Sequence, residues 1–328
     1  MQNNWQSKIV VIFSLLSPTI WAADSQIERG KIPDEYESVG DHALGLNNAG
    51  MAATGGMAAV KMNPAMLPME STYSVSAGYH WPTSGRDFFQ LGVVDSKTSP
   101  IAAGFVYTSF RERYDPTDPT KHYEFDSPVV RRASLGFGQT FKVLALGIGG
   151  QFVEAQPVGH PEADSTNGTS LAIGAAALVT PVLRVGVSAE NLANNKIADY
   201  APRTVRIGTA WMLMSGDLTL HLDARNRERV LALEGPLNTS GFDVNDQADD
   251  ELRLEPENTV IGSFSARIYD LIRLLGAYSQ DVGEEKRSLS GGIAVVGQQM
   301  TLSYTATRPD MRDEQSHQAI NLSVRVSM

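Results

Sequence analysis

The sequence predicts an all-β protein: a transmembrane antiparallel β-barrel of about 14 strands with an N-terminal plug, or hatch, in its lumen. Three observations lead to this prediction. Most of the chain after residue 70 alternates apolar and polar side chains with the period of a β-strand. The connections between the alternating runs are short and long by turns. The stretch before the first run is apolar and glycine-rich, and it fits neither a strand nor a stable helix.

The final run shows the alternation most clearly. Ile320, Leu322 and Val324 share one face, whereas Asn321 and Ser323 share the other. Runs of this kind lie at 71–82, 86–96, 100–113, 127–140, 142–155, 168–180, 182–192, 201–214, 216–231, 257–269, 271–281, 286–297, 299–309 and 315–328. They exceed the roughly 5–6 residues of a soluble strand, and their second face is polar where a β-sandwich would bury apolar side chains. We therefore favour a membrane barrel over a soluble sandwich.

The connections alternate in length. Short ones are expected at Asp95 to Ser99, Phe141, Pro181, Ser215-Gly216, Asp270 and Gln298. Longer ones are expected at 82–86, 113–126, 156–167, 193–200, 232–256, 282–285 and 310–314. Short turns at one end and longer loops at the other are typical of outer-membrane barrels. An even strand number places both ends of the wall at the short-turn, periplasmic end.

The first residues have the pattern of a signal peptide. Lys8 precedes the apolar run 9–16, and we expect cleavage after the small residue Ala22 or one residue from it, because Ile20 at the −3 position is larger than the usual Ala. The apolar run is shorter than the ~20 residues of a membrane anchor. We therefore expect export to the outer membrane of a Gram-negative cell. The expected parts are a signal peptide at 1–22, a periplasmic arm and plug at 23–69, and the barrel at 70–328.

The composition argues against several classes of protein. With 27 Lys and Arg against 37 Asp and Glu, the net charge of −10 disfavours a nucleic-acid partner. The absence of Cys rules out disulfides and thiolate metal sites. None of the six His lies in a His-Glu-x-x-His or Gly-x-Ser-x-Gly setting. We therefore expect no enzyme, and we assign no catalytic residue, metal site or cofactor.

The stretch from Gly45 to Leu67 is rich in Gly, Ala and Met and almost free of charge. So many small residues indicate a segment that passes through a tight space where backbones approach closely. Pro64 biases Asn63 away from helical backbone, which suits a sharp exit from plug to wall. The expected plug residues are Asn47, Asn48, Gly50, Gly55, Gly56, Asn63, Pro64 and Ala65.

The same stretch resembles the start of the FadL-type outer-membrane transporter superfamily, which includes PorV-like barrels. That family has a Gly/Ala-rich N-terminal segment, an Asn-Pro-Ala-Gly-Leu-like motif and then the first strand. In this chain the motif reads Asn63-Pro64-Ala65-Met66-Leu67, with Met66 in place of Gly. The resemblance implies a 14-stranded barrel with an N-terminal hatch. It also implies passage of small hydrophobic or amphipathic molecules or, as in the PorV-like group, docking of exported or surface proteins.

Several charged residues are expected to point into the lumen, since charge on the lipid face is costly. Arg184, Arg267, Arg273 and Arg325 would lie near the periplasmic end, with Arg132 and Arg206 higher up. The four lower arginines could hold the acidic arm, Asp34 to Asp41, through charge-assisted hydrogen bonds. An anionic binding site, for example for a carboxylate headgroup, is the alternative. His221 and Asp223 face the lumen from one strand and are expected to form a satisfied pair.

The third run suggests a side gate. Pro100 opens it and Gly104 interrupts its inner face, and glycine in a strand can mark a bend. FadL-type barrels are thought to release apolar ligands through a kinked third strand. Room for the plug is the favoured reason for Gly104, since many other inner positions are also glycine.

The partners expected from the sequence are outer-membrane lipid and lipopolysaccharide, together with a hydrophobic small-molecule ligand. The acidic loop 234–257 is open to two interpretations, divalent-ion bridging to lipopolysaccharide or a solvated loop. Its spacing does not match an EF-hand. The sequence does not indicate an oligomeric state.

Overall fold

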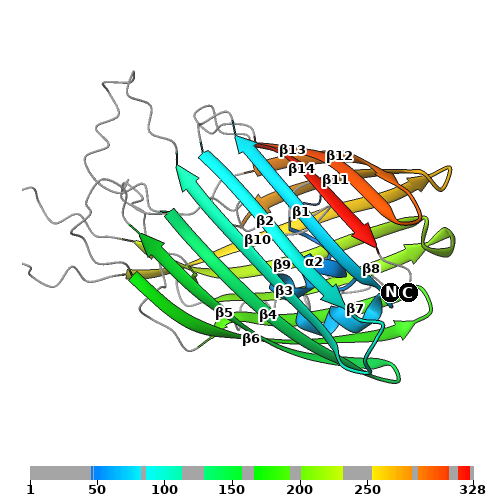
Figure 1. Cartoon of the computed structure of the whole chain (residues 1–328), viewed down its shortest axis with the longest axis horizontal. Coiled ribbons are helices and arrows are strands. Elements are labelled where there is room, and N and C mark those ends of the chain that lie inside the picture. The colour runs from blue at the N-terminus through cyan, green and yellow to red at the C-terminus, as the bar shows by residue number, and fades with distance from the viewer. Residues whose placement is uncertain are drawn as a thin grey trace, which may run out of the picture.

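The computed structural model describes residues 46, 48–82, 86–112, 129–156, 166–192, 201–231, 253–282, 287–309 and 317–325. The proposed signal peptide, the acidic arm, Asn47 and the acidic stretch 232–252 lie outside these residues. The strands form one closed barrel, shown in Figure 1. Each strand pairs antiparallel with its neighbours in sequence, and β14 pairs with β1, so no strand edge is left open.

The wall has the 14 strands predicted from the alternation. They are β1 (Tyr73–Pro82), β2 (Arg86–Asp95), β3 (Ala102–Glu112), β4 (Val129–Phe141), β5 (Leu144–Gln156), β6 (Thr166–Thr180), β7 (Leu183–Leu192), β8 (Thr204–Leu213), β9 (Leu218–Leu231), β10 (Arg253–Ile268), β11 (Ile272–Asp281), β12 (Arg287–Val296), β13 (Met300–Pro309) and β14 (His317–Arg325). Their lengths range from 9 residues in β14 to 16 in β10.

The alternation sets the two faces of the wall. In β13, Thr301, Ser303 and Thr305 are buried, whereas Leu302 and Tyr304 are exposed. Large apolar side chains cover the outer face in the same way on the other strands, as expected of a surface that lipid solvates. Among the described residues, no helix is long and apolar enough to cross a membrane.

Six tight connections gather at one end of the barrel, on the right in Figure 1, at or next to the predicted positions. Tyr269 and Asp270, in the three-residue connection between β10 and β11, both have positive φ, 52° and 54°, a backbone found in tight turns. The short 3₁₀ turn η3 (Met214–Gly216) joins β8 to β9. The wall begins and ends at this end, because Ser74 pairs with Arg325 across the seam.

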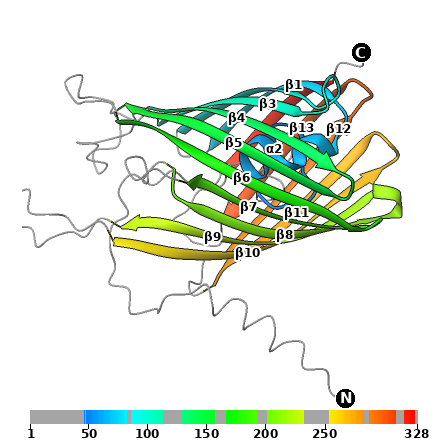
Figure 2. The same ribbon diagram turned by 90° about the horizontal axis from the view of Figure 1, so that it is seen from below.

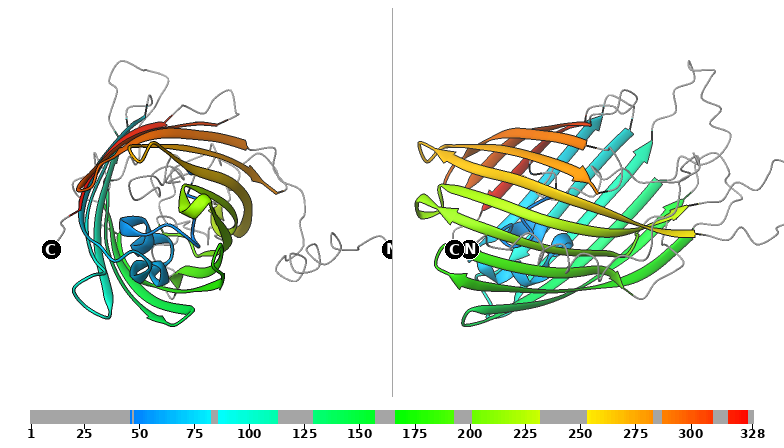
Figure 3. Two further views of the ribbon diagram at one scale, coloured as in Figure 1. Left: turned by 90° about the vertical axis from the view of Figure 1, so that its right-hand side faces the viewer. Right: turned by 180° about the vertical axis from the view of Figure 1, so that it is seen from behind.

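Residues 46 and 48–70, called the inner segment below, lie inside the barrel, as Figures 2 and 3 show. This segment contains α2 (Gly56–Met62) and η2 (Pro64–Met69). The sequence did not predict α2, because glycine inside a helix is costly. Gly55 and Gly56 prove to be the N-cap and first residue of α2, so they do not interrupt it. The segment packs against one side of the lumen, with α2 on β2–β4 and β7, and η2 on β3–β6.

The contact between the inner segment and the wall is a closed apolar core. Its buried side chains include Met57, Val60, Met66 and Leu67 from the segment, and Phe88, Val94, Val106, Val130 and Val153 from β2–β5. Burying one side chain of this size contributes about 1.5–3 kcal/mol. The position of the segment is therefore fixed largely by hydrophobic packing against β2–β5.

Candidate functional site between the inner segment and the wall

Glycines in the wall let the inner segment approach the backbone closely. A Cβ added at Gly147 in β5 would lie 2.8 Å from the Cα of Ala65, and one at Gly138 in β4 would lie 2.8 Å from Cδ of Pro68. In β6, a Cβ at Gly174 would collide with the side-chain oxygen of Asn63. The three strands therefore form a shallow glycine track that receives the turn from α2 to η2.

Asn63 fastens that turn. Its Oδ1 accepts a hydrogen bond from the backbone N–H of Ala65 at 3.2 Å and caps η2. Its Nδ2 donates to the carbonyl of Met51 at 3.1 Å and to that of Ala175 in β6 at 3.4 Å. The residue is fully buried and extended, with φ of −158° and ψ of 96°. This backbone agrees with the bias that Pro64 imposes.

Asp223 in β9 fastens the start of the segment. Its Oδ2 accepts hydrogen bonds from the backbone N–H groups of Gly50, at 2.5 Å, and Met51, at 3.1 Å. Gly50 has φ of 97°, a backbone that an L side chain rarely adopts. The predicted His221–Asp223 pair is therefore wrong. Asp223 serves the inner segment, and Nδ1 of His221 has no hydrogen-bond partner in the described structure.

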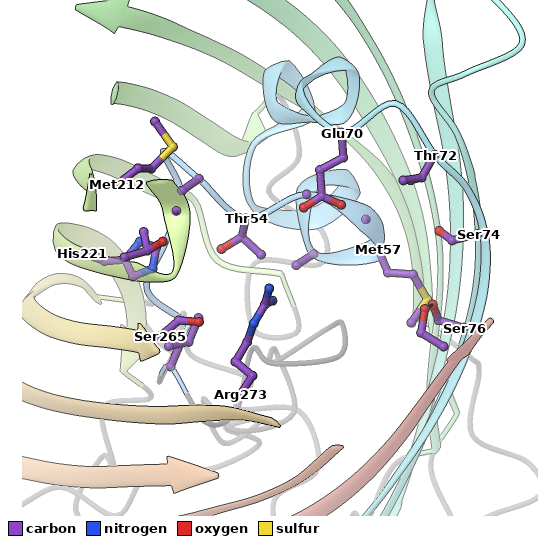
Figure 4. A pocket seen from close by; sticks show the side chains of 18 of the residues that line it. Thr54, Met57, Glu70, Thr72, Ser74, Ser76, Met212, His221, Ser265 and Arg273 are labelled. Carbon is purple, nitrogen blue, oxygen red and sulfur yellow. Dashed lines mark hydrogen bonds between the residues drawn. The ribbon is translucent and has the colours of Figure 1, made fainter. Parts of the chain in front are cut away.

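A cavity of about 220 Å³ lies between the inner segment and the short-turn end of the wall. Figure 4 shows Thr54 and Glu70 of the segment across the cavity from Ser265 and Arg273 of the wall, with His221 at one side and Met57 directed toward Ser76 at the other. Arg184 and Met212 also line it. The cavity combines thioethers, hydroxyls, two arginines and one carboxylate, so an amphipathic or charged guest would find partners on its walls.

The predicted lower arginines do not act as one cluster. Arg184 and Arg273 line the cavity, whereas Arg267 binds Asp217 at the rim, with Nη2 2.7 Å from Oδ1. Arg325 ends β14, and its side chain lies outside the described residues. Asp217 was not predicted as a partner, although it lies beside the β8–β9 turn at the same end of the barrel as Arg267.

The solved structures supply the family comparison. No protein-family model matches the sequence, and no curated protein matches it. The toluene transporter TbuX of Ralstonia pickettii matches with a TM-score of 0.60 and 12% identity over 88% of this chain and 98% of its own. The toluene transporter TodX of P. putida matches with a TM-score of 0.57 and 12% identity over 89% and 100%. A FadL homologue of Pseudomonas aeruginosa matches at 0.55 and 10% identity over 87% and 97%.

The chain has the FadL-type barrel fold. At such low identity the likeness concerns architecture alone. What this FadL-type barrel does must be argued from its own residues.

A second charged layer of the FadL-type barrel lies further from the short turns. Nε of Arg206 donates to Oε1 of Glu190 at 2.8 Å, and both side chains are only 4% exposed. Arg225 lies 3.6 Å from Glu257, and both are buried. Arg206 and Arg132 point inward as predicted. The two glutamates were not singled out from the sequence, although their phase along β7 and β10 places them on the inner face.

The two expected gate residues lie in the β2–β3 connection and within β3. Pro100 is exposed in the turn before β3. Gly104 pairs with Val94 and Gly136 in ladders that have no register shift at that point, so β3 has no bulge there. A Cβ at Gly104 would collide with Val60 and lie 3.3 Å from Leu67. Room for the inner segment accounts for this glycine.

Proposed function

We propose that this barrel lets small hydrophobic or amphipathic molecules pass the outer membrane, and that the inner segment is the plug that gates their path. The observation that carries the proposal is the nature of the plug–wall contact. It is mostly apolar and methionine-rich, and Asn63 and Asp223 give it polar attachments at two points. Methionine surfaces can repack around varied apolar guests.

Two further facts support the proposal. The outer face is apolar on every side of a closed wall, which suits a membrane location. The solved proteins of the same fold include two described as toluene transporters. Export through a signal peptide at 1–22 belongs to the same proposal.

A second candidate function is a filled, structural barrel that docks exported or surface proteins. The tightness of the plug–wall core favours it, because Phe88, Val94 and Val106 are at most 2% exposed. Under this alternative the segment never leaves the wall.

An engineered disulfide that fixes the plug to the wall, called the disulfide trap below, distinguishes the two candidate functions. Because the sequence has no Cys, the introduced pair has no native thiol to react with. A Cβ at Gly136 would lie 3.4 Å from the Cα of Val60, which suits a disulfide between Val60→Cys and Gly136→Cys. Uptake of the hydrophobic dye N-phenyl-1-naphthylamine by cells that produce this pair should fall on oxidation and recover on reduction. The control pair is Ser279→Cys with Ser288→Cys, whose hydroxyls lie 2.8 Å apart within the wall.

The outcomes of the trap are distinct. If cells that produce the reduced protein take up no more dye than cells that lack the protein, the passage proposal fails and the filled barrel is supported. If uptake is raised but the trapped and control pairs behave alike on oxidation, passage stands and the gating role of the plug is lost.

A further inference from the structure

The cavity at the short-turn end carries charges that passage of an apolar molecule does not require. Four ionisable residues line it among the described parts of the chain: Arg184, Arg273, Glu70 and His221. With His221 neutral, two arginines and one glutamate leave a formal charge of +1. A confined site with excess positive charge and several hydroxyl donors favours an anion.

Two buried nitrogens on this lining have no hydrogen-bond partner. They are Nδ1 of His221, in a side chain that is 6% exposed overall, and Nε of Arg184. A buried polar atom without a partner costs about 1–3 kcal/mol, and native structures contain few of them. Both nitrogens are covered, but they belong to side chains that line the cavity, so a small rotation of either side chain would bring an N–H to a guest with oxygen acceptors.

The cationic groups and the opposing wall of the cavity come from different parts of the molecule. Arg184, His221 and Arg273 belong to β7, β9 and β11, whereas Thr54 and Glu70 belong to the inner segment. In Figure 4 the guanidinium of Arg273 reaches across the cavity toward Thr54 and Glu70. An anion held there would touch the wall and the inner segment together.

We propose that this cavity binds a small oxyanion, with carboxylate, sulfate and phosphate as the shared chemistry. Arg184 and Arg273 supply the charged donors, and Thr54 and Ser265 supply hydroxyls. Bound oxyanion links the inner segment to β7 and β11 and stabilises the segment in its place. The inference does not depend on what crosses the membrane.

Glu70 gives the proposal a sharp internal test. It interacts electrostatically with Arg184 and is the one acidic residue among the described cavity-lining residues, so it competes with an incoming anion. Removing its charge through Glu70→Gln should therefore tighten binding, while Arg184→Gln and Arg273→Gln should weaken it. Losing one charge-assisted hydrogen bond corresponds to about tenfold in affinity or more.

The experiment uses the full chain purified in detergent, titrated with sulfate at constant ionic strength kept with chloride. We expect saturable heat in calorimetry and a shift of the His221 ring ¹⁵N resonance, assigned with His221→Gln. Arg267→Gln is the matched control, because Arg267 lies at the same end but binds Asp217 outside the cavity. Arg273→Lys keeps the charge and serves if a Gln variant does not fold.

Three results would overturn the proposal. The first is sulfate binding that is equal in wild type, Arg184→Gln and Arg273→Gln, which would mean an adventitious ion only. The second is no saturable binding to wild type or to Glu70→Gln. The third is binding that emerges only when Asp34, Glu35, Glu37 and Asp41 are neutralised together, which would assign the cavity to the chain's own carboxylates.

Discussion

The carboxylate of Asp223 accepts the backbone N–H of Gly50 at 2.5 Å, across a separation of 173 residues in the sequence. The same oxygen accepts the N–H of Met51. One side chain of the wall thus replaces water for two buried amides of the inner segment. Substitution of Asp223 is therefore the most direct way to test what holds the segment in position.

Replacing Asp223 by Ala should release the start of the inner segment while the wall stays closed. Two amides lose their acceptor, at about 1–3 kcal/mol each if they remain buried. Limited proteolysis should then cut near residues 48–52 faster than in wild type, and the folded barrel should keep its mobility in unheated gels. Asp223→Asn keeps an acceptor oxygen and should be cut at an intermediate rate; equal protection in all three proteins would contradict the role of Asp223.

Adding one methyl group to the glycine track should disturb the segment. In Gly147→Ala the new Cβ meets the backbone at Ala65, which cannot move aside as a flexible side chain would. Overpacking of this kind costs about 1–3 kcal/mol. Urea unfolding in micelles measures it, with Gly262→Ala as the control, because a Cβ at Gly262 meets nothing within 4 Å. Equal losses in both variants would mean that strand propensity, and not the segment, sets the effect.

The two functions of Asn63 can be separated by substitution. Asn63→Asp keeps the oxygen that caps η2 and loses the donor to Met51 and Ala175, whereas Asn63→Ala loses both. The cap contributes about 1 kcal/mol. Hydrogen exchange should therefore show the Ala65 amide opening faster in Asn63→Ala than in Asn63→Asp. An Ala65 amide that exchanges alike in both variants would show that the cap has no effect.

The buried Arg206–Glu190 pair should be far more sensitive than the exposed Arg203–Glu228 pair. Removing one partner of a buried ion pair strands a charge and costs about 3–5 kcal/mol, whereas exposed pairs contribute about 0–1 kcal/mol. The side chains are 4% exposed in the first pair and 56% and 26% in the second. We expect Glu190→Gln to lower the unfolding midpoint much more than Glu228→Gln. A smaller loss in Arg206→Met combined with Glu190→Leu than in Glu190→Gln would locate the cost in the stranded charge.

The wall was predictable because strand period, strand length and turn positions all carry local signals. Leu302 and Thr301 reveal their faces by their place in the alternation alone. The contacts of the inner segment were not predictable, because no sequence pattern near Asp223 indicates that Gly50 is its partner. His221 is closer in sequence and was chosen for that reason. Arg267 was assigned to the lumen because its phase was right, but its partner is Asp217, which lies across from it, directly before the start of the neighbouring strand β9.

The seam between β1 and β14 has a consequence for how the molecule is assembled. Residues 73–82 find their second partner only when residues 317–325 are in place, so the wall stays open until the last strand is added. The inner segment directly precedes β1 and rests on β2–β7, all of which are made before that moment. Assembly in chain order therefore does not thread the segment through a finished ring; the wall is wrapped around it, and β14 is the seal.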